Sequence, residues 1–155
     1  MNGYKANPKL QAIIEAATLE AMDAVMILAS KQIKKKLSTP PTRSGRIYRK
    51  KGGRMHRASR AGESPAVDTG TLRGSWGIRD DGKPETEDGV VTRASGKGRY
   101  KLYFGSRLDY SKIDSGYERV AARPYIEPAL LLVRGQIPKV AARAFAYHLK
   151  RSAGK

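Results

Sequence analysis

The chain contains no cysteine among its 155 residues. This absence excludes disulfide bonds, thiolate metal sites and cysteine nucleophiles, and it is compatible with assembly in a reducing cytoplasm. The sequence also lacks any apolar run approaching the length of about 18 residues that a membrane-spanning helix requires. Because acidic residues interrupt the apolar positions near the N-terminus, we expect no signal peptide and no export. We therefore expect one soluble domain that folds without cross-links and does not enter a membrane.

Acidic residues are scarce, since 14 Asp and Glu stand against 31 Lys and Arg and give a formal net charge of +17. From residue 24 to residue 62 the chain has no acid, yet it has twelve cationic side chains. These are Lys31, Lys34, Lys35, Lys36, Arg43, Arg46, Arg49, Lys50, Lys51, Arg54, Arg57 and Arg60. Such a stretch repels itself and favours contact with a polyanion or an acidic protein surface. A solvated loop without a defined partner is the other interpretation.

Apolar residues at helical spacing predict a first helix over residues 8 to about 37. Asn7 is expected to cap this helix, with Pro8 at the first helical position, where a missing N–H costs nothing. Pro40-Pro41 is expected to end it. Residues 24–29 are apolar on all sides, which predicts burial on more than one side, with another subunit as one possible cover.

The second half of the chain predicts a small antiparallel sheet and a final helix. The expected strands are 75–79, 89–94, 100–105 and 110–114. The final helix begins near Tyr125, and Gly135 and Pro138 predict a kink or interruption within it. The fold class is thus α+β, with a long N-terminal helix and a C-terminal helix packed on a sheet of three to four antiparallel strands. One domain spans residues 1–155.

Residues 38–64 are rich in Ser, Thr, Gly, Pro, Arg and Lys and have hardly any apolar periodicity. This composition predicts a long basic mobile loop, and loops of this length tend to be functional or to become ordered on assembly. Simple disorder and a short β-hairpin around Gly52-Gly53 are the alternatives.

Enzymatic interpretations find little support in the sequence. Asp68-Thr69-Gly70 is also the tripeptide of retroviral-type aspartic proteases, in which two aspartates share a proton. In those enzymes it closes a hydrophobic strand, whereas the polar residues 62–65 come before it here. The two histidines, His56 and His148, have no acidic partner at a spacing typical of a triad or a metal site. We expect no catalytic residue, no cofactor and no metal.

Two motifs separated by roughly fifty residues are the most specific feature of the sequence. The first is Pro65-x-x-Asp68-Thr69-Gly70-x-Leu72-Arg73, and the second is Ala122-Arg123-Pro124-Tyr125. Their order, after a long helix and a variable loop and before a last helix, resembles that of the minor tail or neck (head–tail joining, tail-completion) proteins of long-tailed bacteriophages. The loop before Pro65 is longer and more basic than the resemblance implies.

The resemblance implies a structural virion protein with no catalytic activity and no cofactor. It implies a homo-oligomeric ring, a hexamer or a dodecamer, that is assembled in the host cytoplasm and located in the neck or tail of the virion. The expected partners are adjacent connector and tail-tube or terminator proteins. The phosphate backbone of packaged DNA is a further expected partner where the ring lines the DNA passage.

Two groups of residues are the candidate sites. The corner motif, expected to fix the ends of the sheet and to shape subunit contacts, comprises Asp68, Thr69, Gly70, Leu72, Arg73, Arg123, Pro124 and Tyr125. Within it, Asp68 is expected to cap a helical turn over 69–73, and Arg123 to bind a carboxylate or backbone carbonyls. The alternative is that these residues only terminate secondary structure.

The residues expected to contact DNA or an acidic partner lie in the basic loop. They are Arg43, Arg46, Arg49, Lys50, Lys51, Arg54, Arg57 and Arg60. The alternative function that these residues favour is a free-standing basic nucleic-acid-binding protein.

Overall fold

The computed structural model describes residues 7–38, 45–65, 70–96, 99–116 and 122–153. The elements follow one another as α1 (Pro8–Ser38), β1 (Ile47–Arg49), β2 (Met55–Arg57), α2 (Thr71–Ser75), β3 (Gly89–Gly96), β4 (Arg99–Ser106), the 3₁₀ helix η1 (Asp109–Asp114), α3 (Ile126–Arg134) and α4 (Ile137–Ala153).

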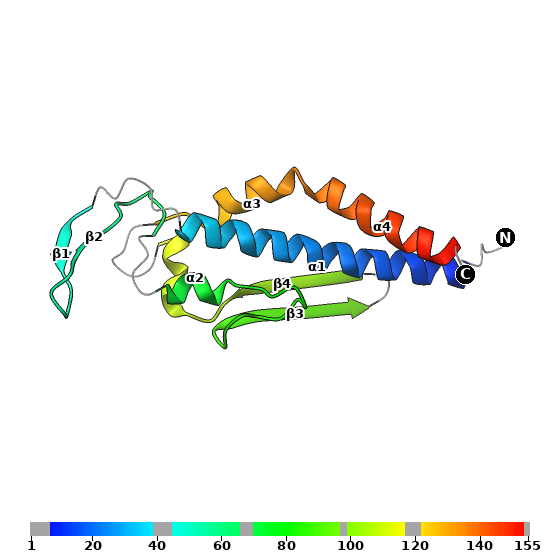
Figure 1. Cartoon of the computed structure of the whole chain (residues 1–155), viewed down its shortest axis with the longest axis horizontal. Coiled ribbons are helices and arrows are strands. Elements are labelled where there is room, and N and C mark those ends of the chain that lie inside the picture. The colour runs from blue at the N-terminus through cyan, green and yellow to red at the C-terminus, as the bar shows by residue number, and fades with distance from the viewer. Residues whose placement is uncertain (1–6, 39–44, 66–69, 97–98, 117–121, 154–155) are drawn as a thin grey trace.

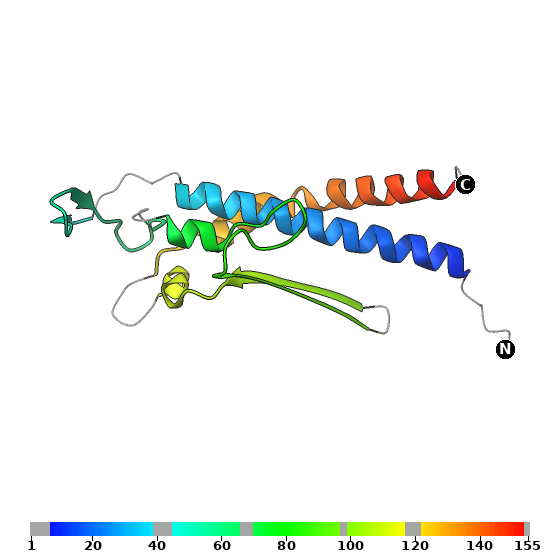
Figure 2. The same ribbon diagram turned by 60° about the horizontal axis from the view of Figure 1, so that its bottom comes forward.

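Helix α1 forms the middle of three layers (Figure 1). Helices α3 and α4 lie along one side of it, and the β3–β4 hairpin lies along the other (Figure 2). Residues 24–29 of α1 are all partly or fully buried. The prediction of burial on more than one side is therefore confirmed, and this chain itself supplies both covering layers.

Local signals place the ends of α1 correctly. The Asn7 Oδ1 atom accepts hydrogen bonds from the backbone N–H groups of Lys9, at 3.0 Å, and Leu10, at 3.4 Å. Asn7 therefore caps the helix as predicted, because these two N–H groups have no partner within the first turn. The helix ends at Ser38, one residue after the predicted end.

The C-terminal helix is interrupted, as Gly135 and Pro138 predict. Helix α3 ends at Arg134 and α4 begins at Ile137, with Pro138 in the first turn of α4. Proline is tolerated there because the first N–H groups of a helix have no intrahelical partner. Both helices pack against α1, as expected for the last element.

The strands β3 and β4 pair in antiparallel register from Gly89 opposite Ser106 to Gly96 opposite Arg99. These two predicted strands are confirmed. Leu102 and Phe104 of β4 line a groove together with residues of α1, whereas Tyr103 between them is 58% exposed. The side chains of β4 thus alternate between a covered and an exposed face, as expected for a strand that packs on one side only.

The predicted strand over 75–79 is wrong. Ser75 ends α2, and only Ile78 forms a β-bridge, with Pro84. The reason is a tertiary contact, because the Ile78 N–H donates to the Ser30 hydroxyl of α1 at 3.0 Å instead of joining a ladder. Trp76 and Ile78 are both buried.

The predicted strand over 110–114 is also wrong, since this segment is η1. Its carbonyl groups at Ser111 and Ile113 accept hydrogen bonds from the Tyr125 hydroxyl and the Arg123 N–H. These two carbonyl groups thus bind the segment before α3 and do not pair with a neighbouring strand. The class remains α+β with a small antiparallel sheet, but the sheet beside α1 has two strands and not three or four.

A second hairpin, β1–β2, lies beyond the C-terminal end of α1, away from the three layers (Figure 1). Residues 45–60, which contain it, are called the basic arm below. Gly52 and Gly53 form its turn with φ angles of 109° and 84°, a region that L side chains rarely adopt. The prediction of a loop without secondary structure is therefore wrong for this segment. The alternative prediction, a short β-hairpin around Gly52-Gly53, is confirmed.

The best-packed core lies where α1, α2 and α3 meet. Its buried members are Ile33, Leu37, Trp76, Tyr125 and Ala129. The partly buried Leu72, Phe104, Ile113 and Ile126 pack around them. No helix in the described part of the chain combines the length and hydropathy needed to cross a bilayer.

Candidate functional site

The structure brings the two sequence motifs together in the core. Leu72, from the first motif, and Tyr125, from the second, belong to the same hydrophobic cluster. Asp68 and Thr69 lie outside the described residues. The helical turn predicted over 69–73 is observed as Thr71–Ser75, and Gly70, with φ of 84°, occupies the N-cap position predicted for Asp68.

Trp76 and Tyr125 form the link between the motifs. The Trp76 Nε1–H donates to the Tyr125 hydroxyl at 3.2 Å, and their rings meet edge to face with centroids 6.0 Å apart. Phe104 of β4 makes a second edge-to-face contact with Trp76 at 5.9 Å. Tyr125 is fully buried, so its side chain contributes to the core of its own chain.

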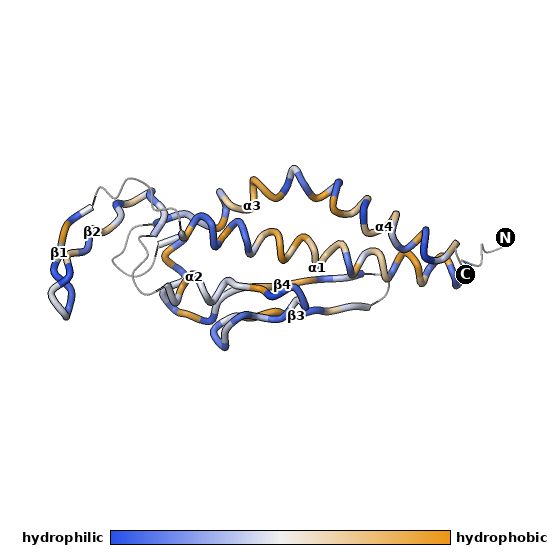
Figure 3. Tube along the Cα trace, in the orientation of Figure 1, coloured by the Kyte–Doolittle hydropathy of each residue, from blue (hydrophilic) through white to orange (hydrophobic). Residues whose placement is uncertain are grey.

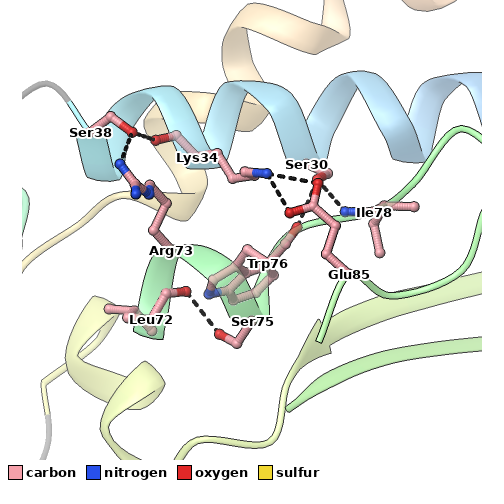
Figure 4. A network of polar contacts seen from close by, with 9 residues as sticks. All are labelled: Ser30, Lys34, Ser38, Leu72, Arg73, Ser75, Trp76, Ile78 and Glu85. Carbon is pink, nitrogen blue, oxygen red and sulfur yellow. Dashed lines mark hydrogen bonds and ion pairs between the residues drawn. The ribbon is translucent and has the colours of Figure 1, made fainter. Parts of the chain in front are cut away.

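Ser30 ties the segment after α2 to α1 (Figure 4). Its hydroxyl donates to the Trp76 carbonyl at 2.7 Å and accepts from the Ile78 N–H at 3.0 Å. Because Ser30 is only 1% exposed, both backbone groups depend on this one side chain for a hydrogen bond. A serine in the apolar middle of a helix was the only sequence signal for this role.

Two further polar contacts hold the same segment against the last turns of α1 (Figure 4). Lys34 forms an ion pair with Glu85, with a Nζ–Oε2 distance of 2.6 Å. Arg73 of the corner motif donates to the Ser38 hydroxyl at 3.4 Å, near the negative end of the helix dipole. Arg73 therefore contacts its own chain at this position.

Asp114 holds the start of α3. Its Oδ1 atom accepts from the backbone N–H groups of Tyr125, at 2.7 Å, and Ile126, at 2.9 Å. A carboxylate in this position satisfies two N–H groups at the helix start and favours the positive end of the dipole. The Ser64 hydroxyl donates to the Pro124 carbonyl at 3.2 Å, which ties the second motif to the segment after the arm.

Arg123 is held by its backbone, since its N–H donates to the Ile113 carbonyl at 2.8 Å. Its side-chain Nε atom is buried and has no hydrogen-bond partner in the described part of the chain. Within the described residues, the predicted bond from Arg123 to a carboxylate or a carbonyl is not made by this nitrogen. Taken together, the described contacts of the corner motif hold secondary structure and the core in place.

Burial raises the pKa of Tyr125 to about 12, with the negative charge of Asp114 adding to the effect and the hydrogen bond from Trp76 opposing it. The folded chain thus keeps this phenol protonated, and its stabilising contribution is present below pH 10 and is lost as the pH rises through about 12. We expect the tyrosinate absorbance of the wild type minus that of Tyr125→Phe to rise only near pH 12. A difference signal that rises near the ordinary tyrosine pKa would contradict this burial.

An apolar groove of about 740 Å³ runs between α1, β4 and the α3–α4 helices. Met22, Val25 and Met26 line it from α1, and Leu130, Leu131 and Phe145 line it from the helices opposite. Leu131 and Leu132 are 61% and 52% exposed, and α3 is apolar along most of its length (Figure 3). The sequence interpretation did not identify this groove, because two helices distant in sequence form it.

The structure places the predicted cationic residues along the basic arm, except Arg43, which lies outside the described residues. Arg46, Arg49, Lys51, Arg54, Arg57 and Arg60 are exposed, and Lys50 is half-buried. The arm thus carries six exposed cationic side chains on a defined hairpin.

The histidines do not form a site in the described part of the chain. His56 is buried in the arm, and His148 of α4 lies 2.6 Å from the Glu20 carboxylate of α1. The His148–Glu20 contact joins residues 128 positions apart, which sequence spacing does not reveal. No group of three or more His, Asp or Glu side chains among the described residues is arranged to hold a metal ion.

Comparison of the chain with family models, with curated proteins and with solved structures returned no match.

Proposed function

We propose that this protein is a structural subunit of the head–tail connector of a long-tailed bacteriophage, a neck or tail-completion ring that joins tail to head. In this proposal the protein functions by assembly and not by catalysis. The observation that carries the proposal is the amount of apolar surface left open on a chain whose motifs resemble this family. Among the described residues, 13 large hydrophobic side chains are exposed, whereas 12 hydrophobic residues, five of them alanine, are buried.

Exposed apolar side chains occur at two separate places on the chain, called patches below. The α3 patch consists of Leu130, Leu131 and Leu132, of which Leu130 and Leu131 line the groove. The end patch consists of Leu10 and Ile14 near the start of α1 and of Tyr147 and Leu149 near the end of α4, and these two helix ends lie at the same end of the molecule (Figure 1).

Two different patches on one chain fit a head-to-tail contact, which closes into a ring when the rotation between neighbours allows it. In our proposal the α3 patch of one copy packs on the end patch of the next copy, and the occupant of the groove is this second copy. The high net charge opposes close approach of copies, so salt is expected to favour assembly.

The test is the mass of the protein in solution, measured by analytical ultracentrifugation at several salt concentrations. We expect six or twelve copies for the wild type, and single copies for Leu131→Glu and for Leu149→Glu, because a buried unpaired charge strongly opposes an apolar contact. Tyr103→Gln, at an exposed position of β4, is the matched control and is expected to assemble normally.

Mixing the two glutamate variants makes the test specific for head-to-tail contact. Leu131→Glu retains an intact end patch and Leu149→Glu retains an intact α3 patch, so the mixture is expected to form one-to-one dimers and no larger ring. A wild type that remains monomeric at every salt and protein concentration would overturn the proposed function. Assembly of the single variants would overturn the proposed contact.

A further inference from the structure

The basic arm carries positive charge that the described part of the chain does not neutralise. Seven cationic side chains lie within residues 45–60, and no acidic residue does. Six of them are exposed and form no ion pair with any residue that the structure describes: Arg46, Arg49, Lys51, Arg54, Arg57 and Arg60.

Six cations outside the arm are paired with acids of the same chain. Lys31, Lys34, Arg79, Lys83, Arg93 and Lys112 each pair with an aspartate or a glutamate. Arg93 of β3, for example, reaches Asp23 of α1 at 2.7 Å. Near the arm, the Glu63 carboxylate accepts from the backbone N–H of Arg60 at 2.7 Å. The six exposed cationic side chains of the arm therefore keep their charge for a partner outside the described chain.

The arm presents this charge on a two-stranded ribbon. In its register Ile47 is opposite Arg57 and Arg49 is opposite Met55, so these four side chains share one face. Each arginine is across from an apolar residue, which avoids the repulsion of two like charges directly opposite. A two-stranded ribbon has the width that the major groove of B-DNA admits.

The chemistry of the arm favours a polyanion over an acidic protein surface. Its exposed large apolar side chains are Ile47 and Met55 alone among those described. A protein interface needs a fully buried apolar centre, in which lysine is depleted. Regularly spaced phosphates need only cations, and each contact releases a counterion.

We propose that the basic arm binds the phosphate backbone of duplex DNA. The inference rests on the proposed function for the place where the protein meets DNA, which is the passage through the ring. Arg46, Arg49, Lys51, Arg54, Arg57 and Arg60 supply the contacts, and the glycine turn allows the tip to approach the duplex closely. Binding of this kind does not depend on base sequence.

The test is fluorescence anisotropy with a labelled duplex of about 20 base pairs at increasing salt, because backbone contacts give a steep salt dependence. Six contacts predict that the logarithm of the binding constant falls against the logarithm of salt with a slope of about −5, a loss of about 10³-fold between about 50 and about 200 mM. For Lys51→Gln/Arg54→Gln/Arg57→Gln the slope is expected to be about −2.7, a loss of about 40-fold over the same range.

The matched control is Lys139→Gln/Arg143→Gln/Arg151→Gln, which removes the same charge from exposed positions of α4. Its slope is expected to equal that of the wild type. An equal loss of slope in both triple variants would overturn the assignment to the arm. Absence of salt-dependent duplex binding, with binding of poly-glutamate instead, would overturn DNA as the ligand and indicate an acidic protein partner.

Failure of this inference is distinguishable from failure of the proposed function. The arm variant is expected to keep the mass of the wild-type assembly, because the arm is remote from both apolar patches. Raised salt is expected to strengthen assembly and to weaken DNA binding. Rings that do not bind DNA overturn only the inference, whereas a DNA-binding monomer overturns only the proposed function.

Discussion

Replacing Trp76 with alanine is expected to lower the free energy of unfolding by about 3–5 kcal/mol. Trp76 lies at the centre of the core, where its ring contacts Phe104 and Tyr125 and its Nε1–H donates to the Tyr125 hydroxyl. Truncation removes these contacts and leaves a cavity that α1 and β4, held by other elements, cannot fully close. Chemical denaturation followed by far-ultraviolet circular dichroism measures the loss.

Trp76→Phe is the control for this prediction. Phenylalanine retains most of the apolar volume and loses the hydrogen bond, so a smaller loss than for alanine is expected. If the alanine variant lost less than about 1 kcal/mol, a typical value for any substitution, Trp76 would not be the centre of the core.

Replacing Ser30 with alanine is expected to cost about 2–4 kcal/mol, because two buried backbone groups lose their partner at once. The Trp76 carbonyl and the Ile78 N–H both bind the Ser30 hydroxyl, and no water reaches a side chain that is 1% exposed. Thermal or chemical unfolding of the purified variant measures this cost.

Ser38→Ala is the matched control for Ser30, since Ser38 lies on the same helix but is exposed. Its hydroxyl donates to the Lys34 carbonyl at 2.6 Å and accepts from Arg73 at 3.4 Å, and water can replace both of these exposed contacts. We expect the control to change stability by less than about 0.5 kcal/mol. Equal effects of the two substitutions would contradict the bridging role of Ser30.

Features set by neighbouring residues were predicted well from the sequence. Asn7 and Pro8 predicted the start of α1, Gly135 and Pro138 predicted the interruption before α4, and alternating residues predicted β3 and β4. At the helix ends the deciding hydrogen bonds and steric limits act within a few residues, so composition and spacing are sufficient. The two strands are neighbours in sequence and pair across a short turn.

Features set by distant residues were not predicted. Ile78 was assigned to a strand, but its N–H is taken by Ser30, 48 positions earlier. The segment containing Ser111 was also assigned to a strand, but its carbonyl accepts from the Tyr125 hydroxyl. A periodicity over neighbouring residues contains no information about such partners.

The two candidate sites also differ in how well the sequence predicts them. The cationic residues of the arm follow directly from the sequence, because charge is a property of each residue. The corner motif was expected to shape contacts with other subunits, whereas Tyr125 is fully buried and Leu72 packs against the core of its own chain. The surfaces that we propose for assembly include exposed leucines of α3 and α4, and periodicity does not show which apolar side chains remain exposed in the folded chain.

The central claim is that this chain assembles head to tail into a closed ring. Negative-stain electron microscopy of the purified wild-type protein, at the salt concentration where its solution mass is greatest, tests it most directly. Class averages are predicted to show rings of six or twelve subunits with an open centre. Particles of single-subunit size, twofold dimers or open filaments at every salt concentration would contradict the claim.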